Sequence, residues 1–160
     1  MNRHSVRRAP IRRTPALLLS DALLLLCAVP GTVFSFVTAF DLTTDRTVLL
    51  LVCGLCALIS LALFSLPRGR HCLLALAALF PPGALAVWRL WTPLNLGEVW
   101  VRCAVVNRFA QELRFLREIH PLAQHSEQVW TQLGTLYLAA LTAGLALLLG
   151  WAVCRVRSFW

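Results

Sequence analysis

The chain alternates long apolar blocks with short polar segments, and four of the blocks are long enough to cross a bilayer. These blocks cover residues 16–40, 47–66, 72–90 and 129–153. A stretch of about 20 predominantly apolar residues forms a helix that matches the hydrocarbon core of a membrane. The pattern therefore predicts an all-α, polytopic membrane protein with four transmembrane helices.

A fifth helix is predicted between the third and fourth spans, where apolar and polar residues recur at helical spacing. Its apolar positions are Leu96, Val99, Cys103, Val106, Ala110 and Leu113. Its charged residues include two i, i+4 pairs, Arg108–Glu112 and Arg114–Glu118. We expect an amphipathic interfacial helix over about residues 96–118, which lies flat on the outer leaflet or caps the bundle.

The arginines are distributed unequally between the connections and predict the orientation of the spans. The first segment (1–15), the second connection (67–71) and the last segment (155–160) are short and basic, which is typical of cytoplasmic segments. The residues that we assign as topology anchors are Arg8, Arg12, Arg13, Arg68, Arg70, Arg155 and Arg157. Both ends of the sequence are then cytoplasmic, and the helix over 96–118 is external.

Composition and charge agree with this interpretation. Charged residues make up 14% of the chain, against about 25% in ordinary soluble domains, and the apolar residues come in blocks without a polar face. The net charge of +8 does not indicate nucleic-acid binding, because the arginines lie at the ends of apolar spans rather than in one interleaved patch. The partner they indicate is the lipid bilayer, with a preference for anionic head groups.

The six cysteines do not predict a disulfide framework. Four of them fall inside the spans, Cys72 opens the third span, and Cys103 alone lies in an external segment. Cys53 and Cys56 form a CxxC motif in the middle of the second span, where thiols behave as small apolar side chains. We therefore interpret this pair as a packing feature.

Asp21 is the candidate intramembrane polar site. An ionisable side chain inside a span is a functional hypothesis by default. Asp21 lies about 7.5 Å along the helix from Ala16, since each residue adds 1.5 Å. At that depth it can reach the cytoplasmic interface, cap the helix or pair with nearby arginines (Arg12, Arg13, Arg68 and Arg70). Coupling to a proton or an ion is the functional alternative.

Three prolines predict helix breaks inside the spans. Pro30 removes a backbone donor from the first span, and Thr32, Ser35 and Thr38 follow it as possible donors to the freed carbonyl. Pro81 and Pro82 are consecutive and predict a sharp kink or a broken helix in the third span. Broken helices hold substrates in transporters, whereas a lone kink more often sets a packing angle. Tryptophans mark the outer interface after this break: Trp88, Trp91 and Trp100.

The fourth span carries small residues at spacings that allow close helix packing. They are Gly134, Ala139, Ala140, Ala143, Gly144 and Gly150. Small residues let two helix backbones approach each other in a membrane. The fourth span is therefore the predicted packing centre of the bundle.

No set of residues predicts catalysis, a cofactor or a metal site. His120 and His125 lie near Glu118 and Glu127, but two histidines five residues apart, with a proline between them, match no standard zinc site. We expect a protein that is not an enzyme.

Three stretches resemble the amino-terminal membrane region of bacterial transglutaminase-like membrane proteins found in Firmicutes. They read LLLSDALLLLCAVPGTVFSFVTAF, LFSLPRGR and LWTPLNLGEVWVRCAVVNRFAQEL, and the closing GWAVCRVRSFW resembles the turn before a further span. The resemblance implies several helices that precede a large external domain with a Cys-His-Asp triad. None of those catalytic residues can be placed in this chain. We expect the chain to continue beyond Trp160, although a four-span protein can also end there.

Two functions follow as hypotheses. The first is a non-catalytic anchor or scaffold domain in the bacterial plasma membrane, with a fused or separate extracytoplasmic domain as its partner. The alternative is a small transporter or channel subunit, in a homo-oligomer, that uses Asp21 and the Pro81–Pro82 break.

Overall fold

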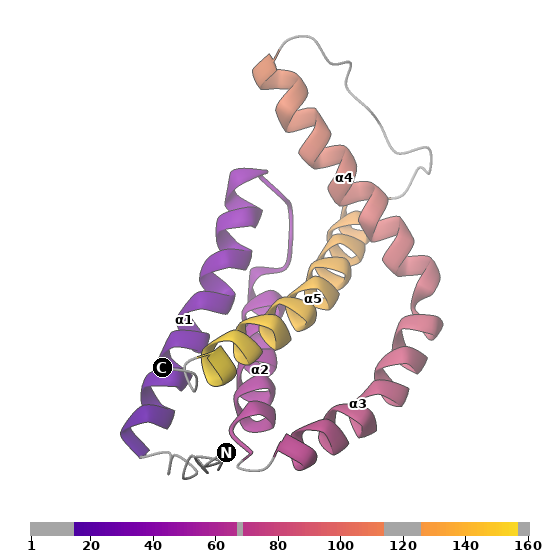
Figure 1. Ribbon diagram of the computed structural model, residues 1–160. Helices are drawn as coiled ribbons and strands as arrows, with labels where there is room; N and C mark the ends of the chain where they lie inside the picture. The colour runs from indigo at the N-terminus through magenta and orange to yellow at the C-terminus, as the bar shows by residue number, and fades with distance from the viewer. Residues whose placement is uncertain (1–14, 67–68, 114–125, 157–160) are drawn as a thin grey trace, which may run out of the picture.

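The computed structural model describes residues 15–66, 69–113 and 126–156, which fold into five α-helices and one short π-helix (Figure 1). The helices are α1 (Pro15–Ala39), α2 (Arg46–Phe64), α3 (Gly69–Arg89), α4 (Trp91–Leu113), α5 (Glu127–Trp151) and the π-helix η1 (Ala152–Val156). By length and composition, α1, α2, α3 and α5 can each cross a membrane. The predicted class, all-α with four candidate spans and one further helix, is confirmed.

The helix between the third and fourth spans begins earlier than the sequence predicted. It starts at Trp91 instead of residue 96, so that Leu90 alone separates α3 from α4. The backbone amide of Leu94 donates to the carbonyl of Leu90, which links the two helices without a loop. The predicted stretch 114–118 lies outside the described residues.

The helices run between two ends of the molecule, which we name after one residue at each. The Asp45 end holds the end of α1 and the starts of α2 and α5, and the Cys72 end holds the end of α2 and the start of α3 (Figure 1). The start of α1 and the end of α5 also lie at the Cys72 end. This arrangement agrees with the predicted common side for the basic segments.

The core forms around α5, which packs against α1, α2 and α4. On α1 every fourth residue from Asp21 to Val37 is buried, and this face meets α2 and α5. The main cluster contains Leu25, Val29, Val33, Val37, Leu42, Leu49, Cys53, Ala57, Val101, Leu138 and Ala146. The prediction that the fourth span is the packing centre is consistent with these contacts.

Small residues bring α2 and α5 into close contact. Thr142, Ala146 and Gly150 recur every four residues on the face of α5 that meets α2, and all three are buried. The hydroxyl of Ser60 on α2 donates to the carbonyl oxygen of Ala146 across 2.6 Å. A Cβ atom at Gly150 would overlap the Ser60 hydroxyl, so this crossing requires glycine.

Helix α4 packs along the first half of α5. Of the two predicted placements, flat on the outer leaflet or as a cap on the bundle, this contact agrees with the second. Gly97 of α4 faces the carbonyl oxygen of Leu133 and the Cβ atom of Tyr137, with no room for a side chain. The ring of Trp100 lies over Gly134 in the same way. The closest contact of α4 with α5 is therefore made at a glycine. A search for apolar side chains at helical spacing does not detect such a position, because glycine has no side chain.

Helices α1 and α3 continue through Pro30, Pro81 and Pro82, so neither helix is interrupted at these residues. Of the two predictions for Pro81 and Pro82, a sharp kink or a broken helix, the continuous helix rules out the second. A proline removes one amide donor and crowds the carbonyl four residues earlier, which bends a helix but leaves its other hydrogen bonds in place. Figure 1 accordingly shows α3 as a curved helix. The hydroxyl of Thr32 donates to Ala28, not to Leu26, the carbonyl that Pro30 deprives of its donor.

Asp45 is the N-cap of α2 and joins it to α5. Its carboxylate accepts from the amides of Thr47 and Val48 at 3.1 and 3.2 Å, and its own amide donates to the Thr135 hydroxyl at 3.0 Å. Asp45→Ala is expected to lower the free energy of unfolding by about 1 kcal/mol, because two amides lose their acceptor. Unfolding by sodium dodecyl sulfate in mixed micelles measures this loss. Asp45→Asn is the control, since asparagine also caps helices; equal losses in both variants would contradict the capping role.

Candidate functional site

Asp21 lies on the buried face of α1, in line with Leu25 and Val29. Its side chain is 5% exposed, although it sits only two turns from the start of the helix. It therefore faces the protein, whereas the sequence left open that it reaches the interface. A buried carboxylate in a span needs a partner, and Asp21 does interact within the structure.

Ser60, Thr135 and Thr142 are the other buried polar side chains among the described residues. Thr135 donates to the carbonyl of Thr131 and accepts from the Asp45 amide, and Thr142 donates to the carbonyl of Leu138. The Ser60 hydroxyl bonds to α5, as described above. Each hydroxyl is thus engaged with backbone groups of the bundle, which makes these residues part of the helix packing.

The cysteines of the second span pack into the core. Cys53 has no exposed surface and belongs to the main cluster, while Cys56 is half-buried against it. Both are free thiols. This placement agrees with the interpretation of the CxxC motif as a packing feature.

Asp21 and the Pro81–Pro82 pair are not brought together. No Cα atom of α1 lies within 8 Å of a Cα atom of α3 in the described part of the chain. Both prolines are exposed, as is every residue from Ala77 to Thr92. The combination of acid and helix break that the transporter hypothesis requires is therefore absent from the described residues.

Two grooves lie on the surface of α1. One, of about 230 Å³, is formed by Thr32, Val33 and Phe36 with residues 138–145 of α5. The other, of about 530 Å³, is an open hollow lined by Gly31, Phe34, Ser35, Thr38 and Ala39. The first groove is almost entirely apolar, and the second is shallow and open with only the hydroxyls of Ser35 and Thr38 in its described lining. Neither groove therefore has a set of polar groups that converge on a ligand.

Several predicted residues cannot be placed. Arg8, Arg12, Arg13, Arg68, Arg157, His120 and His125 lie outside the described residues, and the side chains of Arg70 and Arg155 are not described. The backbone of Arg70 lies in the first turn of α3 and that of Arg155 lies in η1, both at the Cys72 end. In the described part of the chain no three His, Cys, Asp or Glu side chains are grouped as metal ligands.

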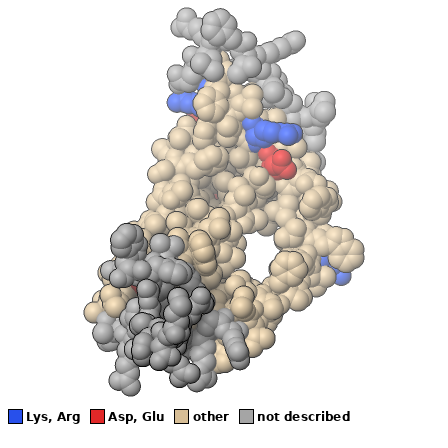
Figure 2. Space-filling model, in the orientation of Figure 1, with Lys and Arg blue, Asp and Glu red and all other residues tan. Residues whose placement is uncertain are grey.

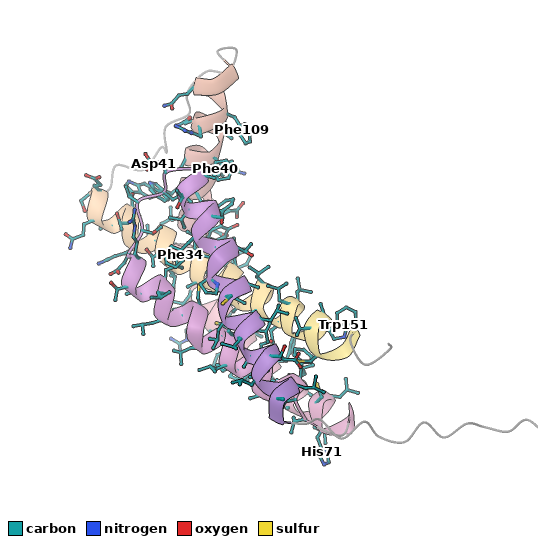
Figure 3. All side chains as sticks on the ribbon, turned by 90° about the vertical axis from the view of Figure 1, so that its left-hand side faces the viewer. Phe34, Phe40, Asp41, His71, Phe109 and Trp151 are labelled. Carbon is teal, nitrogen blue, oxygen red and sulfur yellow. The ribbon has the colours of Figure 1, made fainter. Side chains whose placement is uncertain are left out.

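An aromatic contact that the sequence did not predict joins α1 to α4. Phe40, the residue after the end of α1, lies beside Phe109 of α4 with ring centroids 5.8 Å apart (Figure 3). The ring centroid of Phe36, in the last turn of α1, lies 4.8 Å from that of Phe40. The next residue, Asp41, has a positive φ of 48° where the chain turns toward α2. No spacing rule links residues so far apart in sequence, so only the fold reveals this contact.

These features define a candidate multi-span helical membrane protein, in which the hydroxyls of Ser60, Thr135 and Thr142 bond to backbone atoms. No family model, curated protein or solved structure matches the chain. The resemblance to transglutaminase-like membrane proteins therefore gains no support from these comparisons.

Proposed function

We propose that this chain is a non-catalytic anchor or scaffold domain in the bacterial plasma membrane, whose partner is a fused or separate extracytoplasmic domain. The observation that carries the proposal is that the buried polar side chains of the spans interact within the protein. Ser60, Thr135 and Thr142 bond to backbone atoms, and Asp21 is buried with an interaction of its own. A transporter needs polar groups along a path, whereas a scaffold needs them to fix its helices.

The packing of α4 supports the same function. Helix α4 follows a candidate span, is fixed to α5 through Gly97 and carries exposed charged residues such as Glu98 and Arg102. A rigid polar extension of a membrane bundle is suited to hold a domain at a set distance from the bilayer. The partner that we propose, an extracytoplasmic domain, would meet the protein on this helix.

Asp21→Asn separates the scaffold from the transporter alternative. The substitution keeps the shape of the side chain and removes its charge, so we expect unchanged membrane insertion, measured as resistance to carbonate extraction. In vesicles that contain a pH-sensitive dye, wild type and variant are both expected to show the proton leak of empty vesicles. Proton flux by the wild type that Asp21→Asn abolishes would overturn the scaffold and establish the transporter.

A further inference from the structure

We draw no further inference here: the strongest candidate, the opening between the exposed apolar face of α3 and the rest of the bundle (Figure 2), carries nothing, because nothing in the part of the chain that the structure describes shows what covers that face.

Discussion

Gly150→Leu is expected to destabilise the bundle by about 2–4 kcal/mol, since a side chain would be forced into a helix contact and one interhelical hydrogen bond would be lost. The Cβ atom alone would overlap the Ser60 hydroxyl and lie 3.1 Å from the Phe64 ring. α2 and α5 would have to separate, and the bond from Ser60 to Ala146 would break. The fraction of sodium dodecyl sulfate needed for unfolding in mixed micelles measures the loss.

Gly144→Leu is the matched control for this prediction. Gly144 lies in the same helix, but a Cβ atom there would meet nothing within 4 Å. Leucine forms helices better than glycine by up to about 1 kcal/mol, so the control should be as stable as wild type or more so. Equal losses in Gly144→Leu and Gly150→Leu would show that leucine harms α5 in general, and the close contact would not be the cause.

A pair of compensating substitutions tests whether Gly150 and Ser60 are in direct contact. Gly150→Ala introduces the overlap with Ser60, and Ser60→Gly removes the atoms that it meets. The double variant is therefore expected to recover part of the stability that Gly150→Ala loses. Additive losses would contradict direct contact, because residues that touch are energetically coupled.

The spans could be predicted from the sequence because a membrane helix is defined by local properties. Twenty apolar residues must satisfy their backbone groups internally, so the helix follows from length and composition alone. The second span, predicted over 47–66, is found as Arg46–Phe64, and the fourth, predicted over 129–153, as Glu127–Trp151 with η1 after it. Small residues at fixed spacing also identified α5 as the packing centre.

The partners of α3 and α4 could not be predicted, because they depend on where helices cross. Helix α4 was expected to lie on the leaflet or to cap the bundle through an apolar stripe, and its close contact with α5 is made at Gly97, which has no side chain and is not part of that stripe. The prolines of α3 predicted a sharp kink or a broken helix, and whether a helix bends or stops depends on how its ends are held. Cys72 and Gly97 hold them here, and they lie on separate helices.

The burial of Asp21 could not be predicted from the sequence either. Its depth along α1 was compatible with the membrane interface, and only the direction of its face decides between lipid and protein. That direction is set by Leu25 and Val29, which follow at four-residue spacing and belong to the core. The candidate site is thus a residue of the bundle interior, and its role depends on the packing around it.

Gly97→Leu is expected to release α4 from α5. The atom that a side chain would meet is the backbone carbonyl oxygen of Leu133, which cannot move without shifting α5. Overpacking of this kind costs about 1–3 kcal/mol, and at 1.4 kcal/mol for each factor of ten the released state would become about 5- to 100-fold more populated. Cys103 reports the release, because it lies on α4 and is 8% exposed in the packed state. A membrane-impermeant maleimide, with the labelled residue located by mass spectrometry, should modify Cys103 faster by that factor.

The matched control is Gly83→Leu on α3, where a Cβ atom would meet nothing within 4 Å. This variant introduces a leucine into α3 instead of α4, so Cys103 should be labelled at the wild-type rate. If Gly97→Leu also labels at that rate, α4 is not held through Gly97. The rigid extension on which the scaffold function relies would then lose its main contact with α5, and Trp100 on Gly134 would have to hold the helix alone.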